Sequence, residues 1–129
     1  MREFSDEAKI RRHHKMVEVL RTEIYEILRR EVKDPRVHDL TLTAVELSPD
    51  LRSSTIYVCK FAVGDGHEPT TEEQVELMSG LKSASHFVYE ALKKRLRMKI
   101  IPSIRFEYDN RISLSSEVWR KIHGTTSAV

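Results

Sequence analysis

Along this chain the spacing of apolar residues changes from a helical period to a strand-like alternation and back, which limits the folds it can adopt. The first segment, about residues 6–32, carries apolar residues three and four apart: Val17, Leu20, Ile24, Ile27 and Leu28. Ser5 or Asp6 is predicted to cap its start. Pro35 is predicted to end it, because a proline pushes the preceding residue out of the helical region. We therefore expect a long first helix with one apolar face.

Residues 40–63 alternate instead between apolar and polar side chains, as in half-buried strands. The alternation changes phase near Ala44, and one inserted residue, a β-bulge, would explain the change. Residues 48–50, Ser-Pro-Asp, are typical of a turn. Residues 55–63 are rich in β-branched and aromatic residues, which favour strands. The segment is predicted to form an antiparallel hairpin.

Helical spacing returns from Thr70 to about residue 97, and Thr70 with Glu73 fits a capping box at its start. Four small residues interrupt the middle of this segment: Gly80, Ser83, Ala84 and Ser85. Glycine and serine disfavour a straight helix interior. We therefore expect a break or sharp kink at residues 83–85 that divides the segment into two helices. A third strand is predicted at residues 104–108.

The predicted order is helix, strand, strand, helix, helix, strand (αββααβ), an α+β fold with a three-stranded sheet and helices on one face. A chain of 129 residues indicates one domain. We assign it to residues 1–110, and residues 111–129 to a C-terminal extension. The extension carries apolar residues at helical spacing and is expected to form a short helix before a frayed end: Leu114, Val118, Trp119 and Ile122.

The composition excludes several classes of protein. The single Cys59 excludes an intramolecular disulfide framework and a cysteine-based zinc site, and it is expected to be a small core residue. No apolar run approaches the roughly 18 residues of a membrane span, and the start of the chain lacks a secretory signal. We expect a cytoplasmic protein with no metal and no cofactor. Five aromatic residues are expected in the core rather than as platforms for bases: Phe61, Phe87, Phe106, Tyr108 and Trp119.

The net charge of +2 is the sum of unlike segments. Residues 1–36 carry ten basic and eight acidic residues, and residues 37–76 carry two basic and eight acidic residues. Residues 77–109 then carry seven basic and three acidic residues, and residues 110–129 carry three basic and one acidic. Such segregation suggests a polyanionic partner for the basic part of the chain.

Two groups of residues are candidates for binding phosphates, which requires several cations along one surface. The first group is Lys82, His86, Lys93, Lys94, Arg95, Arg97, Lys99 and Arg105. If the kink is modest, one helix side is shared by Lys82, His86, Lys93 and Arg97. The second group is Arg11, Arg12 and Lys15, of which the first and last can meet one ligand. For both groups a solvated helix surface without a ligand is the alternative.

Six short motifs follow one another along the chain, and their order and the gaps between them are informative together. They are Asp-Pro-Arg at 34–36, Val-Glu-Leu-Ser at 45–48, Asp-Leu at 50–51, Ile-Tyr-Val at 56–58, Leu-Arg-Met-Lys-Ile-Ile-Pro at 96–102 and Phe-Glu-Tyr-Asp at 106–109. Together they resemble the ribosome-binding factor A family, bacterial small-subunit assembly factors with a type II K-homology fold. The resemblance covers about residues 9–123.

Two positions depart from the pattern of this family. Ordinary K-homology domains clamp single-stranded RNA with a Gly-x-x-Gly loop, which this family replaces with an Ala-x-Gly kink. Here Ala84-Ser85-His86 stands at the kink, and Tyr89 stands where the family usually has arginine. The resemblance still implies a kink, but a different RNA contact at the arginine position.

The resemblance implies a non-enzymatic factor that binds the immature small ribosomal subunit at its ribosomal RNA, near the decoding region. It further implies assistance to late maturation, including 5′-end processing, and to growth in the cold. A monomer is expected, and any energy source would lie in a partner such as a ribosome-associated GTPase. An α+β regulatory or interaction module that binds a small molecule or protein is the alternative. A small enzyme has little support from the residues.

Overall fold

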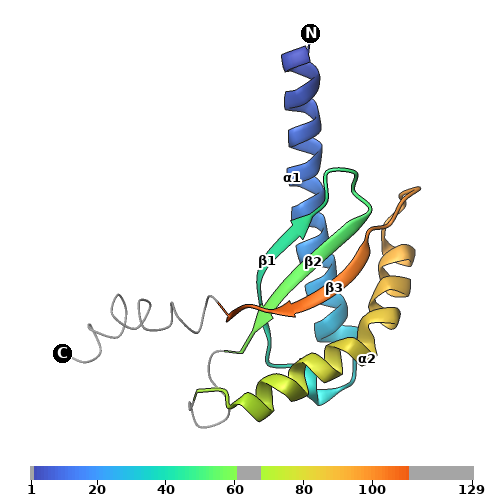
Figure 1. The fold of residues 1–129 in the computed structure, drawn as a ribbon. Helices are drawn as coiled ribbons and strands as arrows, with labels where there is room; N and C mark the ends of the chain where they lie inside the picture. The colour runs from blue at the N-terminus through green and yellow to red at the C-terminus, as the bar shows by residue number, and fades with distance from the viewer. Residues whose placement is uncertain (1, 61–67, 111–129) are drawn as a thin grey trace, which may run out of the picture.

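The computed structural model describes residues 2–60 and 68–110. Its elements are α1 (Arg2–Glu26), a π-helical turn η1 (Ile27–Glu31), a 3₁₀ turn η2 (Pro35–Val37), β1 (Thr41–Leu47), β2 (Ser53–Cys59), α2 (Thr71–Arg95) and β3 (Ser103–Tyr108). The strands form one sheet in the order β1-β2-β3. Figure 1 shows α1 passing behind this sheet and α2 running beneath it and up beside β3. The α+β architecture with three strands is confirmed.

The strands place their apolar residues on one face. β1 pairs with β2 in antiparallel fashion and β3 pairs with β2 in parallel, so that Val45, Ile56 and Phe106 lie side by side in register. This face joins the buried apolar residues of both helices in one core. The helices therefore cover one face of the sheet, as expected.

The predicted hairpin and its bulge are confirmed. The register of β1 against β2 shifts between Leu42 and Ala44, which leaves Thr43 as the inserted residue. The hydroxyl of Thr43 donates a hydrogen bond of 2.6 Å to the carboxylate of the buried Asp109, which follows β3. The bulge thus ties the start of β1 to the end of β3. The strand predicted at residues 55–63 ends at Cys59, and residues 61–63 lie outside the described part of the chain.

The first helix differs from its prediction at its start, whereas its helical turns end at Glu31, close to the expected end near residue 32. It begins at Arg2, so the predicted caps at Ser5 and Asp6 are wrong. It ends in the π turn Ile27–Glu31, and Asp34 before Pro35 has an extended backbone, as expected from proline sterics. Figure 1 shows that the first part of α1 extends beyond the sheet.

The second helical segment is one continuous helix. The capping box is confirmed, since the Thr70 hydroxyl accepts from the Glu73 backbone and the Glu73 carboxylate accepts from the Thr70 backbone. The expected division into two helices at residues 83–85 is not observed. In Figure 1 the helix instead changes direction between its yellow-green first part and its gold last part. The Ser85 hydroxyl donates to the Lys82 carbonyl (2.9 Å), a contact that often accompanies a helix bend.

Gly80 has a packing role rather than a role in breaking the helix. A Cβ atom at this position would lie 3.0 Å from both Arg36 Cβ and Val37 Cγ1. The absence of a side chain therefore allows the turn η2 to lie directly on α2, next to the place where α1 ends. The close approach joins the two helical parts of the molecule.

The aromatic residues do not all lie in the core. Phe106 and Tyr108 pack against it, but Phe87 is 47% exposed, so its predicted burial is wrong. Cys59 is buried, as predicted. Phe61, Trp119 and the predicted C-terminal helix lie outside the described residues.

Candidate nucleic-acid interface

The exposed side of α2 changes from acidic to basic along its length. Its first turn carries Glu72 and Glu73, next to the positive end of the helix dipole, and its last turn carries Lys93, Lys94 and Arg95. The helix thus separates charge along its axis. A polyanion would be attracted to its C-terminal half and repelled from its start.

One stripe of α2 presents three of the predicted residues together. Lys82, His86 and Lys93 are exposed, and their offsets of four and seven residues place them on one side of a regular helix. Lys93 Nζ lies 5.5 Å from the ring centroid of Tyr89 and 3.5 Å from the Glu90 carboxylate. These contacts restrain the Lys93 ammonium without burying it, because its side chain remains 47% exposed.

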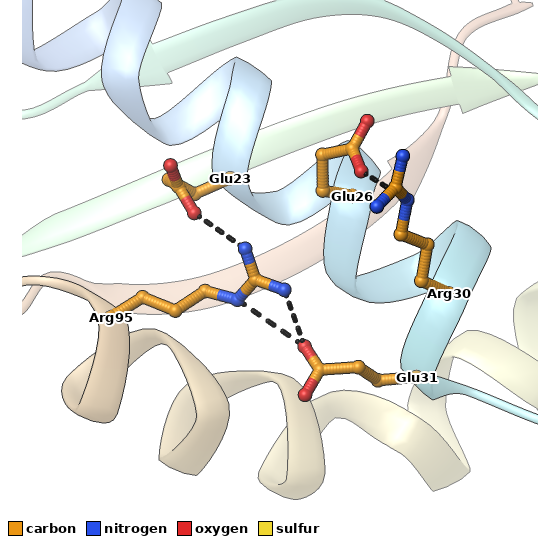
Figure 2. Close-up of polar contacts among 5 residues, drawn as sticks. All are labelled: Glu23, Glu26, Arg30, Glu31 and Arg95. Carbon is orange, nitrogen blue, oxygen red and sulfur yellow. Dashed lines mark hydrogen bonds and ion pairs between the residues drawn. The ribbon is translucent and has the colours of Figure 1, made fainter.

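Arg95 has a different environment from its neighbours in the basic run. Figure 2 shows its guanidinium between two carboxylates of the first helical segment, with Nη1 2.9 Å from Glu23 Oε2 and Nη2 2.9 Å from Glu31 Oε2. Hydrogen bonds that Arg95 donates to the carboxylates of Glu23 and Glu31 raise the pKa of Arg95 above its ordinary value. Arg95 therefore links the end of α2 to α1 and η1 in this structure.

The π turn explains how two carboxylates eight residues apart reach one arginine. In a regular α-helix, residues eight apart point about 80° away from each other. A π turn accommodates one additional residue, which brings Glu23 and Glu31 to nearly the same side of the helix. Figure 2 also shows Arg30 paired with Glu26 at 2.7 Å on another side of the same turn. No sequence signal that we used indicated this geometry.

Arg97 and Lys99 do not lie on the helix, because α2 ends at Arg95. They belong to the connection of residues 96–102, where Met98 (41% exposed) and Ile100 (47% exposed) alternate with them. The buried Pro102 then leads the chain into β3. The expectation that Arg97 shares a helix side with Lys82 is therefore wrong, although both side chains are exposed.

Arg105 points away from the other members of its group. It is in register with Thr55 and Glu46, on the sheet face opposite the core, and pairs with Glu107 at 2.8 Å. The helix cations and Arg105 thus lie on different sides of the molecule. One ligand surface does not include them all.

The N-terminal group lies at the same end of the sheet as the α2–β3 connection. The ring of His13 is 2.7 Å from the carbonyl of Leu47, where β1 ends, and all of Arg11, Arg12 and Lys15 are exposed. The turn after β1 reaches β3, because the Ser103 amide donates to the Arg52 carbonyl. The exposed Arg52, absent from the sequence prediction, joins these cations at this end. Its isolation among polar turn residues gave no signal in the sequence.

A shallow cleft of about 310 Å³ lies beside the predicted kink. It is lined by Glu31, Val32, Lys33, Asp34, Ser83, Ala84 and Phe87. Ala84 is buried and Ser83 is exposed, and these two small side chains leave room beside the exposed Phe87 ring. An exposed aromatic ring is a suitable surface for an unpaired base, and Lys33 lines this cleft together with the carboxylates of Glu31 and Asp34.

The described residues offer little support for a reactive thiol, a metal site or a membrane-spanning helix. Burial, together with the nearby Asp109 charge, raises the pKa of Cys59 to about 11, so the thiol is protonated at neutral pH. Among residues 2–60 and 68–110, no cluster of His, Cys, Asp or Glu is able to hold a metal ion. Within the same residues no helix is long and apolar enough to cross a membrane.

A family described as "Ribosome-binding factor A" matches residues 12–122. The ribosome-binding factor A of Dictyoglomus thermophilum is 38% identical over 112 residues, which cover 86% of this chain and 88% of the relative. A Thermotoga maritima solution structure of a ribosome binding factor A superposes with a TM-score of 0.61 at 30% identity, over 74% of this chain and 85% of that chain. A homology model of the Thermus thermophilus ribosome binding factor A has been fitted into a cryo-EM map of a 30S complex. It superposes with a TM-score of 0.54 at 27% identity, over 72% of this chain and 90% of that chain.

Proposed function

The chain belongs to the ribosome-binding factor A family, and on this premise we propose that it binds the immature small ribosomal subunit through ribosomal RNA. A relative of similar fold has been placed in a complex with the 30S subunit. The binding part of this proposal rests on the family and on the surface of α2. The steps that follow binding rest on the family alone.

The exposed cations of α2 and its connection to β3 are the observation that carries the proposal. Among the residues that the structure describes, Lys82, Lys94, Arg97 and Lys99 make no ion pair. Cations that are not neutralised by carboxylates can exchange their counterions for phosphates, which drives binding to RNA. The acidic first turn of α2 repels RNA phosphates from the opposite end of the helix. This asymmetry supports one defined orientation on the RNA.

The contact set differs from the one expected from the sequence. We assign direct phosphate contacts to Lys82, Lys93, Lys94, Arg97 and Lys99, with His86 beside them. Arg95 is assigned to the link between the helices, and Arg105 is left out because it lies on the opposite face. Phe87 is added as a surface for an unpaired base. Arg11, Arg12 and Lys15 form a second contact region at the end of the sheet.

After binding, the protein holds an unfinished conformation of the RNA and assists late maturation, including 5′-end processing, before it leaves. No catalytic group is needed, because binding energy alone shifts the populations of RNA conformers. A benefit to growth in the cold follows from the slower rearrangement of RNA helices at low temperature. The protein acts as a monomer in the cytoplasm, and a ribosome-associated GTPase is a candidate partner for release.

Co-sedimentation with immature small subunits at several salt concentrations tests this function. We expect affinity to fall steeply with salt, and the double variant Lys93→Glu with Arg97→Glu to abolish binding with a nearly unchanged thermal melt. The double variant Arg29→Glu with Arg105→Glu alters the net charge equally, but outside the proposed surface, and should retain most of the binding. Equal loss in both variants would show that only total charge matters. Absence of binding at low salt would contradict the function itself, and salt-tolerant binding of a small ligand would favour a regulatory module.

A further inference from the structure

A groove between α1 and the edge of the sheet is not used by the proposed RNA surface. It has a volume of about 440 Å³ and is lined by Arg21, Thr22, Tyr25, Glu26, Leu40, Thr41 and Leu42. Tyr25 is 41% exposed above it, and Leu42 packs only partly against the core. Because Arg21 and Glu26 contribute one charge of each sign, the groove suits an apolar occupant better than a polyanion.

The groove also runs along an unpaired strand edge. β1 is the first strand in the order β1-β2-β3 and pairs only with β2 among the described residues. Exposed strand edges favour pairing with other chains, and proteins commonly cover them. A segment in this groove would cover the start of β1.

The described chain ends next to this groove. The Asp109 amide donates to the Val58 carbonyl, and Val58 is the register partner of Leu42 in β1. The Asp109 carboxylate also accepts from Thr43 in the bulge of β1. The chain therefore leaves β3 about two interstrand spacings, roughly 10 Å, from the edge of β1. Three extended residues, 111–113, span about 10 Å.

The sequence that follows offers a suitable occupant. Its apolar residues recur at offsets of four, five and eight: Leu114, Val118, Trp119 and Ile122. This spacing gives one apolar stripe on a helix, and Leu114 is the first residue that can reach the groove. We propose that the C-terminal segment 114–122 docks its apolar residues into the groove between α1 and β1, over Tyr25 and Leu42.

The single tryptophan of the chain makes this docking measurable, because fluorescence then reports on Trp119 alone. In the full-length protein we expect blue-shifted emission and protection from acrylamide. Tyr25→Asp places a charge in the groove and should shift the emission to the red, with a several-fold larger quenching constant. Met98→Asp is the matched control, because Met98 has the same exposed fraction of 41% but precedes the opposite end of β3. It should leave the emission unchanged.

Thermal melts followed by circular dichroism establish that each variant is folded. If Tyr25→Asp unfolds, Thr22→Arg fills the groove from an exposed position and should give the same red shift. Docking is contradicted if Trp119 in the native protein is quenched as strongly as in urea. Protection that survives both groove variants would place the segment elsewhere. Protection that is lost on dilution would show that the groove holds the segment of a second copy.

Discussion

Two sets of cations in this protein differ in what surrounds them. Arg36 and Arg95 lie where α1 and α2 meet, and each is held by carboxylates of the first helical segment or the loop after it. Lys94 and Arg97 are close to Arg95 in sequence but face solvent and make no ion pair among the described residues. Similar residues at neighbouring positions thus have different roles.

The difference shows that a basic run in a sequence is not a single surface. The partners of Arg95 come from residues 64 and 72 positions away, so its role depends on how the helices pack. We expect changes at the helix junction to alter stability and changes on the exposed stripe to alter RNA binding. Three further predictions test this division, beginning with the largest effect.

Gly80→Ala should weaken the junction most. The added Cβ would meet Arg36 Cβ and Val37 Cγ1 at 3.0 Å, and overpacking of this kind reduces the free energy of unfolding by about 1–3 kcal/mol. In an exposed helix the same change would stabilise by about 1 kcal/mol, so the sign of the change is informative. Urea unfolding measures it, with Ser83→Ala on the exposed side of α2 as control. A stabilised Gly80→Ala protein would show that the junction yields easily and does not hold Arg36 in place.

Arg95→Ala should reduce stability without changing RNA binding, whereas Lys94→Ala should weaken RNA binding without changing stability. Removing Arg95 breaks two partly exposed ion pairs and should reduce the free energy of unfolding by about 1 kcal/mol, since such pairs contribute roughly 0.2–1 kcal/mol each. It should leave the salt dependence of RNA binding unchanged. Removing Lys94 should leave the melt unchanged and lower the slope of log affinity against log salt by about 1.

These two variants are each other's control, because the positions are adjacent and each change removes one positive charge. If Arg95→Ala lowered the salt slope as much as Lys94→Ala, Arg95 would contact RNA and the division into two classes would be wrong.

Acid should also weaken the junction, by the smallest amount of the three effects. Hydrogen bonds from the Arg36 side chain, then from its backbone, lower the pKa of Asp34 below its ordinary value of 3.8. Because the folded pKa is depressed, the pair stabilises the protein at higher pH and this contribution is lost as pH falls through the folded pKa. The melting temperature of wild type should therefore exceed that of Arg36→Met at neutral pH, and the difference should narrow below about pH 4. Arg29→Met, on an exposed arginine, should show no such narrowing.

Most of the fold was predictable because local patterns determine it. Helical spacing, strand alternation, the capping box at Thr70 and Glu73, and the proline after Asp34 all act within a few residues. The bulge near Ala44 was predictable for the same reason, since a phase change in alternation requires an inserted residue. The small residues in α2 predicted a break or a sharp kink, and the structure has one continuous helix that changes direction (Figure 1). Gly80 instead accommodates η2, a contact with a segment more than 40 residues away.

The candidate site was predictable in composition but not in arrangement. The basic residues predicted exposed cations on α2 and its connection to β3, and Lys82, Lys93 and Lys94 are exposed. The helix end at Arg95, the exposure of Phe87 and the opposite orientation of Arg105 required the structure. Each depends on which side of an element faces the core, and short or interrupted periodic patterns specify this weakly.

The sequence by itself determined the order of elements, the family and the segregation of charge along the chain, because each is encoded in neighbouring residues or in ordered motifs. Only the tertiary structure decided which cations remain available. A carboxylate from a distant segment neutralises an arginine only when packing brings the two within hydrogen-bond distance. The π turn at Ile27–Glu31 does this for Arg95 by aligning Glu23 with Glu31. Lys94, one residue earlier, faces solvent because the same helix turns its side chain away from that junction.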